Sequence, residues 1–134
     1  MARTLRERVE AARPHVRMLS LAEAKALIDA GNVTLIEVGE AWQLVERGTI
    51  AGARNIARGE FEIPADSELP RRDLRLQDRA QKIILTCGDG GKATLAASAL
   101  MEIGFTNVSA IKGGCEGWRQ AGYPLVRPAR ADRG

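Results

Sequence analysis

Short apolar runs alternate with segments of helical pattern along this chain, and this alternation restricts its fold more than any other feature. Residues 34–38 (TLIEV), 82–86 (KIILT) and 107–112 (NVSAIK) have the composition of strands, and 53–57 (ARNIA) has that of a shorter one. Strands joined through helices pair in parallel, and strands buried on both faces are continuously apolar. We therefore expect an α/β fold with a parallel sheet that helices cover on both faces.

Helices are expected between these strands, and capping residues mark the clearest one. Ser20 and Glu23 fit a capping box at the start of a helix over 21–30, and Gly31 is suited to end it. Further helices are expected over 40–48, 73–80, 93–103 and 115–122. The segment 93–103 is apolar on most sides, so it is expected to be buried.

The 134 residues suit one domain. We expect a basic helical extension over residues 1–17, a folded domain over 18–127 and a disordered tail over 128–134. The net charge of +3 is uneven, because residues 1–17 hold five Arg against two Glu and the middle of the chain is acidic overall. Aromatic residues make up only 4% of the chain, which argues against a nucleic-acid surface and favours solvated basic ends.

The lengths of the apolar runs and the count of cysteines also indicate the cellular location and the kinds of ligand to expect. None is long enough to cross a bilayer, and no apolar segment of signal-peptide length follows the N-terminus. We expect a cytoplasmic protein with no membrane partner, or one exported by a route that the chain does not show. With two cysteines, no CxxC pair and one histidine, neither a disulfide framework nor a metal site is expected, and no cofactor is required.

The stretch LTCGDGGKATLAA places one cysteine between a strand and a helix. The loop consists of Cys87, Gly88, Asp89, Gly90, Gly91 and Lys92. Glycines let several backbone N–H groups turn inward, and the start of the following helix adds more, so the loop is suited to hold an anion. These groups and Lys92 are expected to lower the pKa of the Cys87 thiol. The alternative is a buried, unreactive cysteine beside a turn.

Two other anion-binding motifs fit the loop poorly. A Walker A motif requires a serine or threonine after its lysine, and Ala93 stands there. Cysteine-based phosphatases carry an arginine after five intervening residues, and Ala93 occupies that position too. The loop therefore favours chemistry on sulfur over phosphate hydrolysis.

Four stretches, found over about residues 18–126, together make the chain resemble the single-domain rhodanese family. They are TLIEVGEAWQLVERGTIAGARNIA, KIILTCGDGGKA, GFTNVSAIKGGCEGW and AGYPL. The resemblance implies a five-stranded parallel sheet and a six-residue active loop that starts at Cys87. The loop length is similar to that of the sulfurtransferase members, whereas phosphatase-like members have one more residue.

The resemblance also implies an activity. A Cys87 thiolate takes a sulfane sulfur from thiosulfate or a persulfide, and the Cys87 persulfide passes it to cyanide, to a small thiol or to a protein thiol. The alternative is a non-enzymatic module that carries sulfur or binds a partner, with little turnover of thiosulfate. Monomer and homodimer are both left open.

Several positions depart from the family's usual residues. The strand motif that often reads D-V-R is here Glu37-Val38-Gly39, so its arginine is missing. The residue after the cysteine is often arginine and is here Gly88, followed by the acidic Asp89. These departures weaken the case for thiosulfate as the donor.

Three further residues are candidates for roles at or near the site. Arg58 follows a short strand and is expected either at the pocket mouth or on the solvated surface. Cys115 is expected to pack in the core or to act as a second thiol. Glu37, inside an apolar strand, needs a partner and is expected to order the loop near Gly48.

Overall fold

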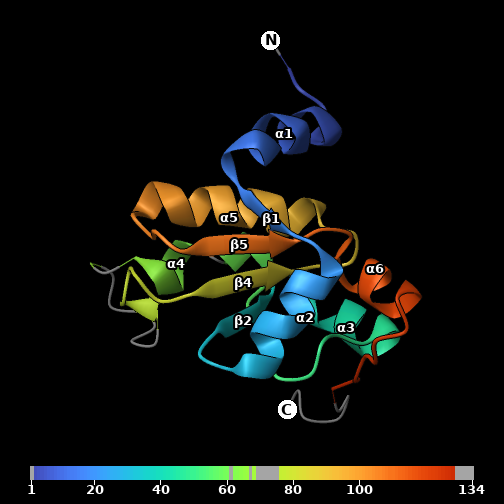
Figure 1. Cartoon of the computed structure of the whole chain (residues 1–134). Helices are drawn as coiled ribbons and strands as arrows, with labels where there is room; N and C mark the ends of the chain where they lie inside the picture. Colours follow the sequence, from blue (N-terminus) through green and yellow to red (C-terminus); the bar gives the residue numbers. More distant parts are fainter. Residues whose placement is uncertain (1, 61, 67, 69–75, 129–134) are drawn as a thin grey trace.

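The computed structural model describes residues 2–60, 62–66, 68 and 76–128, and within them five parallel strands form one sheet (Figure 1). The strands are β1 (Arg17–Leu19), β2 (Thr34–Glu37), β3 (Arg54–Asn55), β4 (Ile83–Thr86) and β5 (Val108–Ile111). Their order is β1-β5-β4-β2-β3, and every pair is parallel. The expected α/β fold with a parallel five-stranded sheet is thus confirmed.

Helices cover both faces of this sheet (Figure 1). The α-helices are α1 (Leu5–Ala12), α2 (Leu21–Ala30), α3 (Ala41–Arg47), α4 (Glu62–Ala65), α5 (Gly91–Ile103) and α6 (Gly114–Gln120). Two 3-10 turns are also present, η1 (Arg13–His15) between α1 and β1 and η2 (Arg58–Glu60) between β3 and α4. Side chains of α4 and α5 pack in one core cluster, and those of α2 and α6 pack in the other. Successive residues of β4 alternate between the two clusters, as a strand buried on both faces requires.

The N-terminal segment, expected to be an extension, packs against the domain. Helix α1 begins at a capping box between Thr4 and Glu7, and it packs against α5 through the buried Val9. Leu5, at the start of the same helix, is 63% exposed. Strand β1 was not expected; it begins at Arg17, the last residue assigned to the extension, and pairs with β5.

Two sequence expectations fall wholly or partly outside the described residues. Of the helix expected over 73–80, residues 73–75 lie outside the described residues. Residues 77–80 contain a turn and no α-helix. Of the tail expected over 128–134, residues 129–134 lie outside the description. In the part of the chain that is described, no helix has the length and apolar character needed to cross a membrane.

The carboxyl ends of the central strands set the position of the site. Glu37 ends β2 and pairs in register with Thr86, which ends β4. The loops that follow these two strands therefore leave the sheet side by side, at the edge where parallel α/β folds carry their sites. Cys87 is the first residue after β4.

Candidate active site

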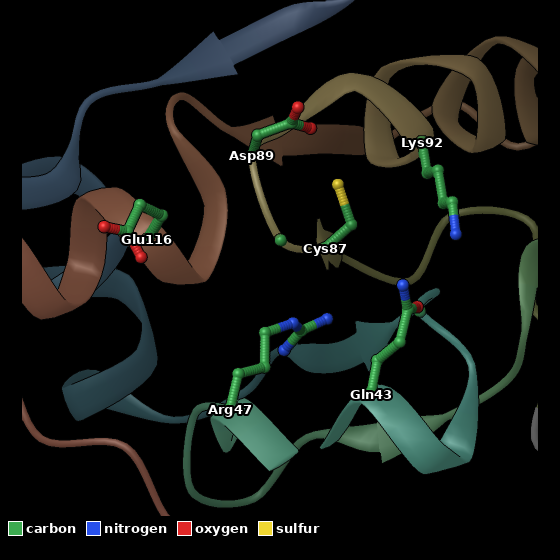
Figure 2. Close-up of a pocket in the computed structure, with 8 residues that line it drawn as sticks. Gln43, Arg47, Cys87, Asp89, Lys92 and Glu116 are labelled. Atoms are coloured by element: carbon green, nitrogen blue, oxygen red, sulfur yellow. The ribbon is translucent and has the colours of Figure 1, made fainter. Parts of the chain in front are cut away.

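A pocket of about 360 Å³ opens at this edge of the sheet. The described residues that line it are Gly39, Gln43, Arg47, Cys87, Gly88, Asp89, Lys92 and Glu116. Figure 2 shows Gln43 and Arg47 extending from α3 toward Cys87 and Lys92 extending from the start of α5, with the carboxylates of Asp89 and Glu116 directed away from the sulfur. The strand–loop–helix segment expected to hold an anion thus forms one wall of a pocket.

The sulfur of Cys87 lies among backbone amides. The N–H of Gly90 donates to Sγ at 3.0 Å, and that of Ala93 lies 3.4 Å from it. Gly90 has a φ of 101°, a left-handed conformation that glycine adopts without strain. The cysteine is only 1% exposed, so a reactant must reach it through the pocket. The amides are suited to stabilise negative charge on this sulfur, or on a second sulfur bonded to it.

The pKa of Cys87 differs in direction from the sequence expectation. Burial raises the pKa of the thiol, and the amides of Ala93 and Gly90 oppose that effect without cancelling it. The charge of Asp89 raises the pKa further. The expected lowering is therefore wrong, because the burial of the sulfur outweighs the amides that point at it.

The active loop is locked to the start of α6 by two backbone hydrogen bonds. The N–H of Cys115 donates to the carbonyl of Cys87 at 2.7 Å, and that of Glu116 donates to Gly88 at 2.9 Å. These bonds bring Gly114 so close that a Cβ atom there would lie 2.4 Å from the Cys87 carbonyl oxygen. Position 114 therefore requires glycine, and the start of α6 holds the backbone of Cys87 and Gly88 in place.

Behind the pocket, the carboxylate of Glu37 is fully buried and accepts several hydrogen bonds. Its donors include the N–H of Gly39 at 2.8 Å, the hydroxyl of Thr49 at 2.8 Å and two nitrogens of Arg47 at 3.1 and 3.2 Å. Arg47 also donates to the carbonyl of Gly48 at 2.6 Å. The expectation that Glu37 orders the loop near Gly48 is confirmed.

Sequence reasoning did not identify Arg47 as a residue of the site. Its side chain leaves the last position of α3, and its guanidinium takes the space that a side chain at Gly39 would need: a Cβ there would lie 2.6 Å from Arg47 Nη2. An arginine is thus present in the pocket although the strand motif has lost its own. The buried Glu37 was the available signal, because an acidic residue in a core strand requires a cation or several donors nearby.

The two charged residues of the loop lie at the sides of the pocket. Asp89 is exposed, and its carboxylate accepts from the N–H of Gly91 at 2.9 Å. Lys92 is half-buried on the first turn of α5 and makes no ion pair within the described part of the chain. Both belong to the pocket lining, so the site carries cationic and anionic groups together.

Arg58 lies outside the pocket as it is described. Its guanidinium pairs with Glu62 at 3.0 Å, and Arg58 is not among the described lining residues. Its Nε is buried and has no hydrogen-bond partner among the described residues. The structure thus gives Arg58 a local ion pair in place of the contact considered at the pocket mouth.

Cys115 lies on the other side of the sheet from Cys87. The two cysteines belong to different core clusters, and the thiol of Cys115 donates to Glu37 Oε1 at 3.4 Å. Burial, and next the charge of Glu37, raise the pKa of Cys115 to about 11. Cys115 therefore stays protonated near neutral pH, and its sulfur is directed to the carboxylate.

Comparisons with known proteins agree with the fold and the site. Residues 20–121 match the family described as "Rhodanese-like domain". The thiosulfate sulfurtransferase GlpE of Actinobacillus pleuropneumoniae serotype 5b is 32% identical over 99 residues, which cover 69% of this chain and 92% of that protein.

Two solved structures show the same architecture. A Rhodopseudomonas palustris protein, RPA3614, described as of unknown function and a possible tyrosine phosphatase, has a TM-score of 0.87 and 26% identity, over 94% of this chain and 96% of that one. The polysulfide-sulfur transferase homodimer of Wolinella succinogenes has a TM-score of 0.70 and 25% identity, over 94% and 89%. The resemblance drawn from the sequence is confirmed, and the chain belongs to the rhodanese-like domain family.

Proposed function

We propose that this protein is a sulfurtransferase that carries a sulfane sulfur as a persulfide on Cys87. The observation that carries the proposal is the position of the Cys87 sulfur, which lies at the pocket and accepts from the amides of Gly90 and Ala93. Amides so placed stabilise the charge of a thiolate and of the persulfide that replaces it. The relationship to thiosulfate sulfurtransferases supports the same reaction class.

With thiosulfate as donor, the reaction has two steps. The Cys87 thiolate attacks the outer sulfur, an S–S bond forms to Cys87, and sulfite leaves with the electron pair of the broken bond. Cyanide or a thiolate then attacks the terminal sulfur of the persulfide and releases the Cys87 thiolate. Cyanide yields thiocyanate, and a thiolate yields a new persulfide. Electrons balance without an external oxidant, metal or cofactor.

Other residues of the pocket supply charge and position. Lys92 offers an ammonium group without an ion-pair partner in the described chain, on the same helix that donates the Ala93 amide. Asp89 opposes a doubly negative donor such as thiosulfate, because its carboxylate lies at the same pocket. This mixture of charges favours a persulfide donor, whose sulfur carries one negative charge where thiosulfate carries two.

Phosphate-ester hydrolysis, the activity suggested for RPA3614, has less support here. The position of the phosphate-gripping arginine is taken by Ala93, whose buried side chain makes no polar contact. We expect no hydrolysis of an aryl phosphate.

The test is the intact mass of the reduced protein before and after exposure to thiosulfate and, separately, to inorganic tetrasulfide. A gain of one sulfur atom that Cys87→Ser abolishes and Cys115→Ser retains is the expected result. We propose that Cys115 is a structural thiol, so its replacement should leave the gain intact. A folded protein that gains no sulfur from either donor would refute the enzyme and favour a partner-binding module.

A further inference from the structure

Arg47 has five N–H donors, and the structure shows which of them are used. The inner N–H groups of Nη1 and Nη2 face the two oxygens of Glu37, at 3.2 and 3.1 Å. The second N–H of Nη1 donates to the carbonyl of Gly48. The Nε–H and the outer Nη2–H make no hydrogen bond within the described residues. These two remaining donors lie side by side and form one edge of the guanidinium.

Two glycines leave this edge uncovered. A Cβ at Gly39 would lie 2.6 Å from Nη2, and a Cβ at Gly88 would lie 3.6 Å from Nε. Both glycines and Arg47 line the pocket that holds Cys87. Figure 2 shows the guanidinium of Arg47 projecting from α3 toward the loop that begins at Cys87. The free edge therefore faces the pocket because positions 39 and 88 carry no side chain.

Glu37 fixes this guanidinium and offsets its charge at the same time. Arg47 is held at three of its donors, so its free edge is preorganised and loses little freedom when an anion binds. The neighbouring carboxylate reduces the net positive charge. Recognition then depends on two directed hydrogen bonds more than on long-range attraction, which suits an anion that presents two oxygens to one edge.

We propose that the Nε–Nη2 edge of Arg47 is a substrate-positioning site that binds the paired oxygens of an anionic sulfur donor, a sulfonate or carboxylate group, beside Cys87. This inference rests on the proposed sulfur transfer for its biological meaning, and the binding itself is separable from it. In this proposal Gly39 and Gly88 have a role, because their lack of side chains leaves the arginine of α3 open to the pocket.

The decisive variant is Gly88→Ala. Its methyl group would lie in ordinary van der Waals contact with Nε, and Gly88 does not have a positive φ, so the change covers the edge without a clash. Gly59→Ala is the matched control, because a Cβ there meets no atom of the described residues within 4 Å and Gly59 is exposed. Arg47→Lys keeps the charge and removes the edge, and its melting temperature reports whether the Glu37 pair is maintained.

Two readouts separate binding from transfer. The first is the KM for thiosulfate, an oxyanion donor, against that for inorganic tetrasulfide, which has no oxygen. The second is the protection of Cys87 from iodoacetamide by sulfite, which needs no turnover. In Gly88→Ala and Arg47→Lys we expect the thiosulfate KM and the sulfite concentration for half-protection to rise about tenfold or more, from the loss of a charge-assisted bond. The KM for tetrasulfide should rise less than the KM for thiosulfate, and every readout in Gly59→Ala should change less than about twofold.

Each remaining outcome decides one of the two proposals. If sulfite protection in Gly88→Ala equals that in the wild type, or if sulfite protects neither, the Arg47 edge binds no oxyanion and the inference is overturned. If thiosulfate and tetrasulfide lose affinity equally, the methyl group obstructs the sulfur and the inference is again overturned. If sulfite protection depends on Arg47 but no donor yields a persulfide, the anion site stands and the sulfur-transfer proposal falls.

Discussion

Replacement of Glu37 by glutamine tests whether the buried carboxylate stabilises the fold and fixes the orientation of Arg47. The substitution keeps the size of the side chain and removes its charge. One carboxylate oxygen accepts from Arg47, Thr49 and Cys115, and the other accepts from Gly39 and Arg47. A glutamine presents an NH₂ group to one of these sets, so at least two donors lose their acceptor in either orientation.

The size of the effect follows from the burial of the pair. Removing one partner of a buried ion pair costs about 3–5 kcal/mol. Glu37 is completely buried, whereas the side chain of Arg47 is 27% exposed and can turn in part toward water. We therefore expect the lower end, about 3 kcal/mol of unfolding free energy. For a domain of this length, that corresponds to a melting temperature lower by roughly 10 °C.

The assay is urea denaturation followed by far-ultraviolet circular dichroism, together with thermal melting. Glu102→Gln is the matched control, because Glu102 is exposed on α5 and its carboxylate forms no hydrogen bond or ion pair within the described residues. The control should change the unfolding free energy by less than about 0.5 kcal/mol. In Glu37→Gln the sulfite affinity of the folded protein should also fall, because Arg47 is no longer held in one orientation.

A loss of less than about 1 kcal/mol in Glu37→Gln would refute this reasoning, since that is the effect of one ordinary neutral hydrogen bond. It would mean that the donors around position 37 find other acceptors or water. The slope of the urea transition should match the wild type; a changed slope would show that the variant alters the compactness of a state and invalidates the comparison.

Three further predictions concern the loop and the second cysteine. Asp89→Asn should lower the pKa of Cys87 and speed its alkylation at pH 7 by a few-fold, measured with iodoacetamide, because an exposed charge that raises the pKa is removed. Gly114→Ala should lower the unfolding free energy by more than about 2 kcal/mol, because position 114 has a φ of 57° and a Cβ there overlaps the Cys87 carbonyl. Cys115 should make folding less stable by about 2–3 kcal/mol as pH rises from about 9 to 11, since its folded pKa is about 11 and its reference value is 9.0.

The direction of the pH effect at Cys115 follows from the protonation state of its thiol in the folded protein. The raised pKa means that the folded protein keeps the neutral thiol, so the contribution is complete below pH 9 and is lost as pH rises through the folded pKa. Cys115→Ser should show a shallower alkaline decline; an identical decline would contradict the assignment. An unchanged alkylation rate in Asp89→Asn would show that the carboxylate does not act on Cys87. Wild-type stability in Gly114→Ala would show that the start of α6 can move away from the Cys87 carbonyl with little loss of unfolding free energy.

The strands and the active loop could be predicted because their signals are local. The apolar runs at 34–38, 82–86 and 107–112 contain β2, β4 and β5, and Cys87 follows β4 as expected. Strand β1 escaped prediction because three residues, of which only Leu19 is fully buried, show no periodicity. It forms through its pairing with β5, a partner about ninety residues away that local sequence does not report.

The sequence by itself determined the order of elements, the six-residue loop and the need of Glu37 for a partner, since each depends on the chemistry of neighbouring residues. Only the tertiary structure decided that Arg47 is this partner, that the two cysteines lie on opposite faces of the sheet and that burial outweighs the amides at Cys87. These outcomes depend on distances between segments remote in the chain and on the exclusion of water, which exist only after packing is complete.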